Sequence, residues 1–320
     1  MSRTEPRQYR VLDVIGRGGF GTVYRAELRL PEGFVKDVAL KVPNTTEADP
    51  RLLARLRDEA RMLGLVHHRA IVGVDALVKV FDRWTVVMEF VDGTSLLALL
   101  RHHGPLPVTI ALQIVEEVAS GLHAAYVATD REGRQLRLLH RDVKPSNVQL
   151  TRFGEVKLLD FGVARGELTG PTRESVTSGS VVYGSVPYLA PERLDLEDGH
   201  ASDVFALVLT LAQLVTGRSP EGPCTDPQKH AAQLDRWRAA LTESGAPLAL
   251  IDWVARGLAW EPTDRPDATE LIRGSRAIRG TLPDIPLSEW AAEHVVAVQQ
   301  ATPPVAGEYT GRWVAEAPTT

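Results

Sequence analysis

The sequence predicts an α+β protein, in which a β-rich part precedes a larger helical part. A chain of 320 residues is long enough for two lobes or two domains. Short runs rich in β-branched residues lie before residue 92, whereas the apolar runs at 108–125 and 201–215 have the length and spacing of helices. Strands first and helices afterwards is the order typical of the α+β class.

The composition describes an ordinary globular protein and excludes several classes. Hydrophobic residues make up 44% of the chain and charged residues 24%. The net charge of −5 gives no signal for nucleic acid or acidic membranes as partners. Cys224 is the one cysteine, so no intrachain disulfide forms, which fits a reducing, cytoplasmic location. The polar N-terminus lacks a signal-peptide core, and the longest apolar run, 201–215, is shorter than the ~20 residues that span a bilayer.

A glycine-rich turn follows the first predicted strand, at residues 9–15. The turn reads Gly-Arg-Gly-Gly-Phe-Gly over residues 16–21, and residues 23–30 read as a second strand. Glycines let such a turn approach phosphates closely and free backbone N–H groups to bind oxygen atoms. Dinucleotide-binding proteins share this spacing, but they need a helix directly after the glycines. Here Thr22 and Val23 continue a strand, so we predict a phosphate-binding hairpin, with a plain hairpin as the alternative.

An opposite pair of charges is expected in the same lobe. The apolar strand at residues 38–41 ends in Lys41, and residues 52–63 have helical spacing with Glu59 on the face of three leucines. A carboxylate on an apolar face needs a partner, and Lys41 supplies one. A solvated helix charge is the alternative for Glu59. Residues 85–91 then read as a buried strand that a turn follows.

Helices dominate the rest of the chain. Residues 108–125 carry apolar side chains at helical spacing, and 201–215 read as a helix buried inside a lobe because it is apolar nearly all round. The polar, glycine-centred residues 129–138 lie between the first of these helices and the loop after it. We expect a small surface hairpin there, with no chemistry of its own.

The strongest chemical signal is the stretch 140–147, which reads His-Arg-Asp-Val-Lys-Pro-Ser-Asn and precedes an Asp-Phe-Gly tripeptide. Asp142 can orient a hydroxyl and accept its proton, and Lys144 can neutralise charge on a phosphoryl group in transfer. Asn147 and Asp160 offer hard oxygen ligands suited to Mg²⁺. At these residues the chain resembles the protein kinases, specifically the Ser/Thr branch, which carries lysine two residues after the catalytic aspartate.

The resemblance covers roughly residues 9–279 and implies the two-lobed protein-kinase fold of a bacterial eukaryotic-like Ser/Thr kinase that uses ATP and Mg²⁺. The implied catalytic residues are Asp142, Lys144, Lys41 and Glu59. The implied ATP-binding residues are Ile15, Gly16, Arg17, Gly18, Gly19, Phe20, Gly21, Val23, Ala39, Lys41, Met88, Glu89, Val91 and Gln149. The implied metal ligands are Asn147 and Asp160.

Within the implied nucleotide site, Met88 takes the gatekeeper position. The Glu89 carbonyl and the Val91 N–H group are expected to hydrogen-bond the adenine. Gln149 departs from the family pattern, which usually has an aliphatic residue beneath the adenine at this position.

The resemblance also implies an activation segment over residues 160–192, whose last part, 184–192, resembles a substrate-docking loop. Ser185 stands where threonine is usual, and its hydroxyl can still bridge Asp142 and Lys144. Arg141 suggests a loop that phosphorylation orders, because a phosphate carries about −1.5 to −2 charges and binds arginine well. The candidate acceptors are Thr172, Ser175, Thr177, Ser178 and Ser180.

Three further residues are expected to have structural roles. Asp203 is expected to hold the backbone of the catalytic loop, and Arg265 to pair with Glu192. His140 is expected to be a core spacer, although a histidine beside the catalytic aspartate also invites a general-base role.

We expect an N-terminal extension at 1–8, a kinase domain at 9–279 with its small lobe at 9–91 and its large lobe at 92–279, and a Pro-rich tail at 280–320. In the tail, residues 288–298 have the spacing of one helix, with Ser288 as N-cap and Trp290 on the apolar face. So short a helix is marginal in water unless Trp290 docks on the large lobe. A linker to a sensor or partner is the preferred interpretation, and a docked helix is the alternative.

The predicted function is transfer of the ATP γ-phosphoryl group to Ser or Thr hydroxyls of protein substrates in signal transduction, with autophosphorylation of the activation loop. A binding-only pseudokinase would lack Lys41, Asp142, Asn147 or Asp160, and all four are present. A small-molecule phosphotransferase of the same fold would lack the docking segment at 184–192. We expect no nucleic acid partner and no membrane span in this chain, while the substrate, the activating signal and the oligomeric state stay open.

Overall fold

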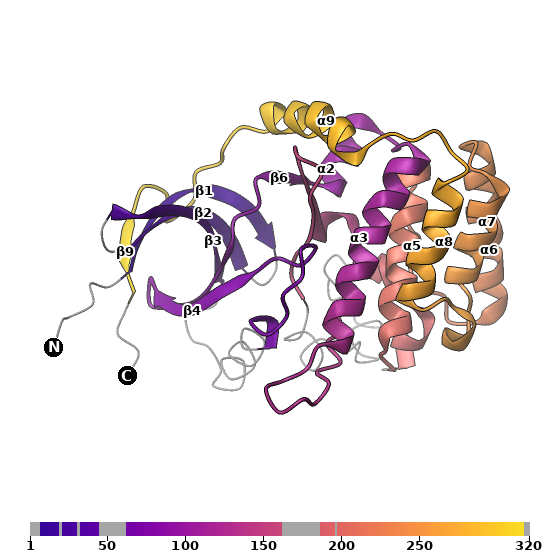
Figure 1. Ribbon diagram of the computed structural model, residues 1–320, viewed down its shortest axis with the longest axis horizontal. Helices are drawn as coiled ribbons and strands as arrows, with labels where there is room; N and C mark the ends of the chain where they lie inside the picture. The colour runs from indigo at the N-terminus through magenta and orange to yellow at the C-terminus, as the bar shows by residue number, and fades with distance from the viewer. Residues whose placement is uncertain are drawn as a thin grey trace. The chain divides into compact units, whose positions relative to one another are not determined.

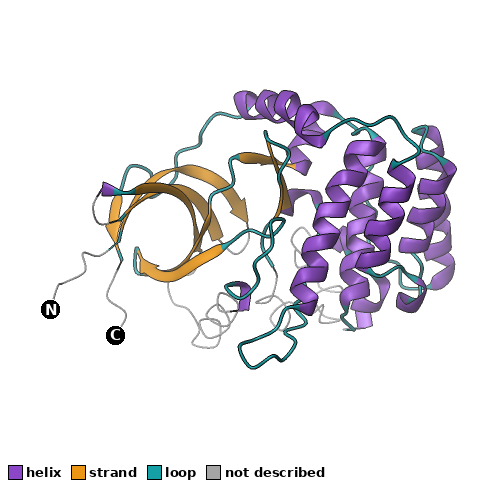
Figure 2. Ribbon diagram, in the orientation of Figure 1, coloured by secondary structure: helices purple, strands orange, loops and turns teal. Residues whose placement is uncertain are grey.

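The computed structural model describes residues 7–18, 21–30, 33–44, 62–161, 186–195 and 197–316. The chain divides into two compact units. The β unit contains residues 1–67, 72–92 and 301–320, and the helical unit contains residues 68–71 and 93–300. Figure 2 shows strands in the first and mostly helices in the second, which confirms the predicted α+β class.

The β unit is built on one antiparallel sheet with the strand order β4-β5-β3-β2-β1-β9. Its strands are β1 (Gln8–Gly18), β2 (Gly21–Arg29), β3 (Val35–Pro43), β4 (Val74–Val80), β5 (Arg83–Glu89) and β9 (Trp313–Ala315). The sheet curls around a core to which alternate residues contribute, such as Tyr24, Ala26 and Leu28 of β2 (Figure 1). The strands predicted at 9–15, 23–30, 38–41 and 85–91 are thus confirmed, within a few residues at their ends.

The helical unit carries a small sheet and several long helices. The sheet has the order β6-β7-β8, with β6 at Gly93–Ser95, β7 at Val148–Thr151 and β8 at Val156–Leu158. The helices are α2 (Leu96–His103), α3 (Val108–Val127), α5 (His200–Thr216), α6 (Pro227–Glu243), α7 (Leu248–Gly257), α8 (Ala268–Arg279) and α9 (Leu287–Ala301). Four 3₁₀ turns are described, η2 (Pro145–Asn147), η4 (Val186–Tyr188), η5 (Pro191–Asp195) and η6 (Pro262–Asp264).

Helix α5 is the buried centre of this unit, as its sequence predicts. All of its residues from Ser202 to Val215 are buried, and it packs against α3, α6 and α7 (Figure 1). Gly217 ends the helix in the left-handed conformation, with φ of 72°. Because the helix is surrounded by protein, its few polar side chains must find partners inside the unit.

The polar insert after α3 folds back on itself. Thr129 and Gln135 form an isolated antiparallel bridge, and the Asp130 carboxylate accepts hydrogen bonds from the backbone N–H groups of Glu132 and Arg134 at 3.0 and 2.8 Å. The small surface hairpin expected from the sequence is therefore confirmed.

The tail differs from the preferred prediction. Helix α9 is present and Trp290 is only 7% exposed, with its ring stacked on His294 at a centroid distance of 4.3 Å. Gln113 of α3 holds the start of the helix, since its side chain donates to Ile285 O at 2.8 Å and accepts from Leu287 N at 3.2 Å. The linker interpretation is wrong for this segment because its apolar face is buried. The helix begins at Leu287, so Ser288 lies in the first turn and is not the N-cap.

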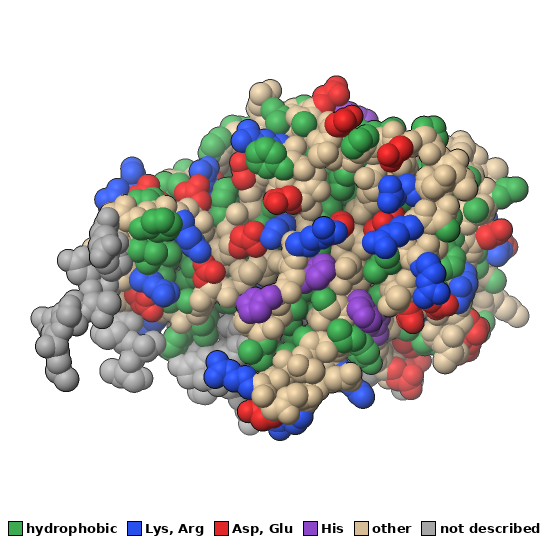
Figure 3. Space-filling model, viewed as in Figure 1, with side chains coloured by type: hydrophobic (Ala, Val, Ile, Leu, Met, Phe, Trp, Pro, Cys, Tyr) green, Lys and Arg blue, Asp and Glu red, His purple; other side chains and the backbone are tan. Residues whose placement is uncertain are grey.

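None of the helices among the described residues is long and apolar enough to cross a membrane. Figure 3 shows acidic and basic side chains interspersed on the visible face, with no large area of one sign. This distribution agrees with the small net charge of −5.

Trp290→Ala should weaken the packing of α9 within the helical unit. Truncating a buried tryptophan typically costs about 3–5 kcal/mol, and we expect about 3 kcal/mol because the ring lies at the edge of the unit. The free energy of unfolding, measured by chemical denaturation, checks this. Glu293→Ala on the exposed side of the same helix is the control and should change little. Equal stability of the two variants would show that α9 is not part of the folded unit.

Candidate active site

The loop at residues 140–147 is held by hydrogen bonds to Asp203, which lies in the first turn of α5. The Asp203 side chain is buried, and its two oxygens accept hydrogen bonds from the backbone N–H groups of His140 and Arg141, both at 2.7 Å. The role predicted for Asp203 is thus confirmed. Because these two donors belong to consecutive residues, a single carboxylate fixes the direction in which the loop leaves the core.

Burial raises the pKa of Asp203 to about 6, and the hydrogen bonds from the His140 and Arg141 N–H groups act against that rise. The ionised form can accept from both N–H groups at once, whereas a protonated carboxyl keeps one full acceptor. The geometry therefore favours a carboxylate at neutral pH.

His140 is a fully buried spacer, as predicted. Its Nδ1 lies 3.2 Å from the Asp142 N–H group and accepts from it, so the proton resides on Nε2, which donates to Leu159 O at 2.7 Å. Both ring nitrogens are used inside the fold. The ring therefore has no nitrogen available to act as a base, and it orients the backbone on both sides.

The Asp142 carboxylate is held by hydrogen bonds and an ion pair from two neighbouring side chains. Lys144 Nζ lies 3.0 and 2.9 Å from its two oxygens, and Asn147 Nδ2 donates to Oδ2 at 2.8 Å. The Asp142 side chain is only 1% exposed and that of Lys144 is 14% exposed. An acid held by a cation and an amide in this way has a fixed orientation, which a group that accepts a hydroxyl proton requires.

Asn147 and Asp160 have the chemistry of a magnesium site. Asn147 Nδ2 also donates to the Asp142 backbone carbonyl at 2.8 Å, so both amide hydrogens are used and the amide oxygen is left as an acceptor. Asp160 follows the end of β8 with a left-handed φ of 58°. An amide oxygen and a carboxylate fit Mg²⁺, which binds few protein ligands and keeps several waters.

The predicted phosphate loop lies in the β unit, at the turn between β1 and β2. The two strands pair up to Gly18 and Gly21, so the glycines are followed by a strand and the hairpin prediction is confirmed. A Cβ atom at Gly21 would lie 2.4 Å from Val42 O, which explains why that position has no side chain. Gly19 and Phe20 fall outside the described residues.

The other residues expected to bind nucleotide in this unit lie on neighbouring strands. Lys41 of β3 pairs with Val23 of β2 and with Val86 of β5, and Ala39 pairs with Met88. Strand β5 ends at Glu89, whose N–H group donates to Gly73 O at 2.9 Å, and Val91 follows outside the strand. Glu59 lies outside the described residues, and its predicted pair with Lys41 with it.

Gln149 lies on β7 of the helical unit. It departs from the family pattern, which usually has an aliphatic residue at this position. Its Oε1 atom is buried and has no hydrogen-bond partner among the described residues. A buried amide oxygen without a donor is costly. This atom is therefore the feature of β7 that most needs a polar partner.

The described part of the docking segment is anchored on α5. The Tyr188 hydroxyl donates to Gln213 Oε1, and burial raises the pKa of Tyr188 to about 12. Gln213 was not predicted to have a role, although a polar residue in an apolar helix is a detectable signal. Residues 162–185, with Ser185 and the candidate phosphate acceptors, fall outside the described residues.

The predicted pair of Glu192 and Arg265 is confirmed. Two guanidinium nitrogens of Arg265 lie 2.7 and 2.8 Å from the two carboxylate oxygens, and the Arg265 side chain is fully buried. Burial favours a higher pKa for Glu192, but hydrogen bonds from Arg265 and Ser202 outweigh it and hold the pKa below its usual value. This pair locks the end of the docking segment to the start of α5.

An ion cluster beside the catalytic loop was not predicted. Arg141 Nε lies 2.5 Å from Asp198 Oδ2 without hydrogen-bond geometry, and Arg193 Nε lies 3.5 Å from Asp198 Oδ1. Arg193 also donates to the Arg141 carbonyl at 2.7 Å. Asp198 is 23% exposed and carries no sequence motif, so nothing in the chain order marks it as a partner of Arg141.

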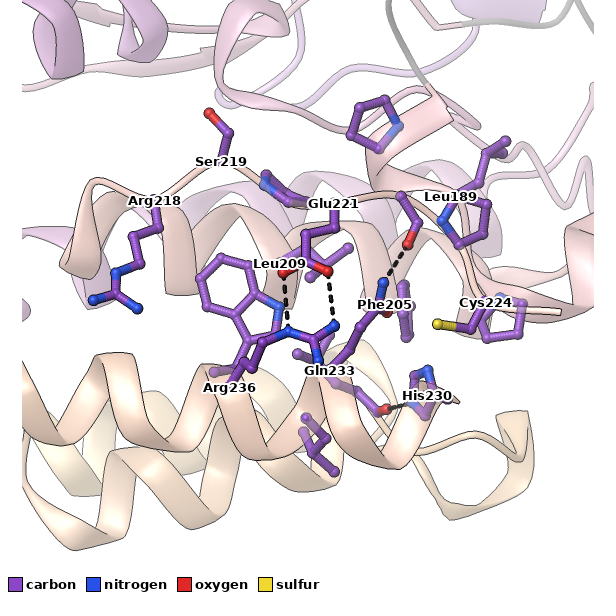
Figure 4. Close-up of a pocket in the computed structure, with 18 of the residues that line it drawn as sticks. Leu189, Phe205, Leu209, Arg218, Ser219, Glu221, Cys224, His230, Gln233 and Arg236 are labelled. Carbon is purple, nitrogen blue, oxygen red and sulfur yellow. Dashed lines mark hydrogen bonds and ion pairs between the residues drawn. The ribbon is translucent and has the colours of Figure 1, made fainter. Parts of the chain in front are cut away.

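A pocket of about 100 Å³ opens behind the docking segment, between that segment, α5 and α6. Figure 4 shows Leu189, Phe205 and Leu209 among the residues that line it, together with the ion pair of Glu221 and Arg236. His230 at its inner end is oriented by a contact from Nε2 to Leu258 O at 2.7 Å. The pocket lining combines apolar side chains with a few charged ones, as sites for apolar side chains often do.

Comparison with known proteins gives one consistent result. The family model of the protein kinase domain matches residues 9–275. The chain is 35% identical over 265 residues to Serine/threonine-protein kinase PknL of Mycobacterium tuberculosis, a match covering 81% of this chain and 62% of that protein. It is 32% identical over 270 residues to Serine/threonine-protein kinase PrkC of Bacillus subtilis, covering 82% of this chain and 39% of that protein. The chain thus spans less than two thirds of the length of these curated relatives.

A solved structure supports the fold alone. The crystal structure of Rad53 1-466 in complex with AMP-PNP matches with a TM-score of 0.62 at 21% identity, over 82% of this chain and 64% of that chain.

Asp203→Asn should destabilise the helical unit although it changes only one atom. The amide would present an N–H group to one of the two loop N–H donors, so a hydrogen bond to a charged group is lost at a cost of about 2–3 kcal/mol. Chemical denaturation measures this loss, and Asp195→Asn at an exposed position is the matched control. A variant as stable as wild type would mean that Asp203 does not hold the loop.

Proposed function

The chain belongs to the protein kinase family, and on that premise we propose that it transfers the γ-phosphoryl group of ATP to Ser and Thr hydroxyls of protein substrates. The relatives it matches are named serine/threonine-protein kinases. The observation that carries the proposal is the carboxylate of Asp142, fixed by Lys144 and Asn147 at 2.8–3.0 Å. A role in signal transduction, in the reducing cytoplasm that the single cysteine favours, is part of the same proposal.

In the proposed reaction, Asp142 orients the incoming hydroxyl and accepts its proton. Lys144 neutralises charge on the transferring group from its place beside Asp142. The transfer is an in-line displacement whose rate comes mainly from positioning and charge stabilisation. The hydrogen bonds that Asp203 accepts from the loop support this role, because they fix the position of Asp142 before substrate arrives.

ATP is the proposed phosphoryl donor. The backbone N–H groups of the β1–β2 glycine turn are proposed to bind its phosphates, and Lys41, paired with Glu59, to hold the α- and β-phosphates. The residues proposed to surround the nucleotide are Ile15, Gly16, Arg17, Gly18, Gly19, Phe20, Gly21, Val23, Ala39, Met88, Glu89, Val91 and Gln149. The register that pairs Val23 with Lys41, and Ala39 with Met88, supports one continuous surface on the β unit.

Magnesium is the proposed metal, with Asn147 and Asp160 as its protein ligands. When bound, it would neutralise phosphate charge. The amide group of Asn147 supports this assignment, because its two hydrogens are committed to Asp142 and its oxygen, which accepts a long hydrogen bond of 3.5 Å from Ser146 Oγ, is the atom left to bind a metal. The hydrogen bond from Asn147 to the Asp142 carboxylate also connects the proposed metal ligand to the proposed proton acceptor.

Residues 184–192 are proposed to dock the protein substrate. The anchors of Tyr188 on Gln213 and of Glu192 on Arg265 support a rigid platform, and the pocket beside Leu189 supplies an apolar recess next to it.

Autophosphorylation of the activation loop is also proposed. Arg141 would bind the phosphate, and in this structure its guanidinium already faces the Asp198 carboxylate. A loop phosphate would have to compete with Asp198 or to join it through Arg193. The charge balance around Arg141 thus supports a site that can exchange one anion for another.

Asp142→Asn should lower phosphate incorporation by roughly 10²–10⁴-fold, the usual contribution of a general acid or base. Lys41→Met should have an equally large effect because it removes the proposed phosphate contact. The assay is incubation with labelled ATP and Mg²⁺, followed by mass spectrometry of phosphorylated residues, with Thr172 to Ser180 as the expected region. Lys79→Met, on an exposed position of β4, is the control. Wild-type incorporation by folded Asp142→Asn protein would contradict the mechanism.

Asp160→Asn should weaken nucleotide binding in the presence of Mg²⁺ more than in its absence, because it removes a proposed metal ligand. Titration calorimetry with and without Mg²⁺ measures both affinities. Glu155→Gln, an exposed carboxylate in the turn between β7 and β8, should leave both unchanged. Equal losses for Asp160→Asn under the two conditions would show that this residue does not bind the metal.

A further inference from the structure

The tail beyond the family domain contributes directly to the β unit. The family match ends at residue 275, yet β9 of the tail pairs with β1 in the register Gln8–Ala315, Tyr9–Val314 and Arg10–Trp313. The strand that leads into the glycine turn is therefore not an edge strand in the described sheet.

The pairing continues beyond β9, towards the glycine turn. Val11 N donates to Arg312 O at 3.0 Å, Gly311 N donates to Val11 O at 2.9 Å, and Val14 N donates to Val305 O at 2.8 Å. The β1–β2 register shifts twice in the same region, once between Val11 and Asp13 and once between Val14 and Gly16. The tail thus satisfies the outer side of β1 where its pairing with β2 is irregular.

The tail also packs against the base of the glycine turn. Val14 of β1 pairs with Tyr24 of β2, and the next pair, Gly16 with Val23, opens the turn. A Cβ atom on Gly307 would lie 2.5 Å from Val14 Cγ2 and 2.8 Å from Tyr24 Cε1. The backbone of Gly307 therefore lies directly on both side chains at this base.

Tyr309 anchors the segment in the core. Its side chain is 5% exposed and its ring stacks on Phe81 with a centroid distance of 3.8 Å and an interplanar angle of 7°. The ring centroid of Tyr24 lies 5.7 Å away. Tyr24 belongs to β2, so the Tyr309 ring contacts the strand that follows the glycine turn. The carbonyl of Val305 accepts a hydrogen bond from Val14 of β1, the strand that precedes the turn.

We infer that the tail segment 305–316 is a positioning element of the ATP site, which holds the glycine turn in place without contacting the nucleotide. This inference rests on the proposed function. Backbone N–H groups bind phosphate well only when their geometry is set beforehand, because ordering them on binding costs affinity. Loosening the tail should therefore weaken ATP binding and leave the proton transfer at Asp142 almost unaffected.

The test compares Tyr309→Ala with Tyr309→Phe and with Val78→Ala. The first removes the stacked ring, and the second keeps it. The third removes volume from the same core on β4, which is separated from β1 and β2 by β5 and β3 in the strand order. We expect Tyr309→Ala to raise the KM for ATP about tenfold with kcat within about twofold, the pattern of lost ground-state binding. Tyr309→Phe and Val78→Ala should keep the wild-type KM.

Hydrogen exchange without nucleotide separates this inference from the proposed function. Tyr309→Ala should speed the exchange of the Val14 and Val23 amides, and Val78→Ala should not. A protein that transfers no phosphate would overturn the proposed function, while the exchange data would still test the tail. Unchanged KM and exchange in Tyr309→Ala, or the same changes in Val78→Ala, would overturn the inference. Self-association of Tyr309→Ala with an unchanged KM would overturn it too, since the tail would then only protect the β1 edge.

Discussion

The buried carboxylate of Asp203 is the interaction on which the catalytic loop depends. It accepts hydrogen bonds from two backbone N–H groups at 2.7 Å, and the Asp203 side chain is itself buried. The loop then turns at Arg141, whose φ of 66° is left-handed and unfavourable for a residue with a side chain. The strain is sustained because the hydrogen bonds on both sides over-determine the conformation. The turn at Arg141 thereby sets the orientation of Asp142, the next residue.

Helix α5 carries more than this one contact. Ser202 and Asp203 lie in its first turn and Gln213 near its end, and each bonds a different part of the site: the Glu192 pair, the catalytic loop and Tyr188. An apolar helix with a few polar residues can hold several loops rigidly, because each polar group has a partner and none is exposed to water. The loop that carries Asp142 and Lys144 and the described part of the docking segment are thus both held by α5.

Much of this arrangement could be predicted from the sequence. The strands, the glycine hairpin, the buried helix and the residues 140–147 are local patterns, and the roles of Asp203, His140 and Arg265 follow from the family motif. The partners of Arg141 and Tyr188 could not be predicted, because Asp198 and Gln213 are distant in the chain and belong to no motif. The linker prediction for the tail was wrong for a related reason. Strand β9 is three residues long, and its stability comes from β1, at the opposite end of the chain.

We infer from its contacts with α5 that the catalytic loop is preformed before any nucleotide or substrate binds. Amide hydrogen exchange of His140 and Arg141 in the nucleotide-free protein tests it most directly. We expect both amides to exchange as slowly as the backbone amides inside α5, although they lie in a loop. Exchange at the rate of the amide of Arg131, an exposed residue of the hairpin after α3, would contradict it.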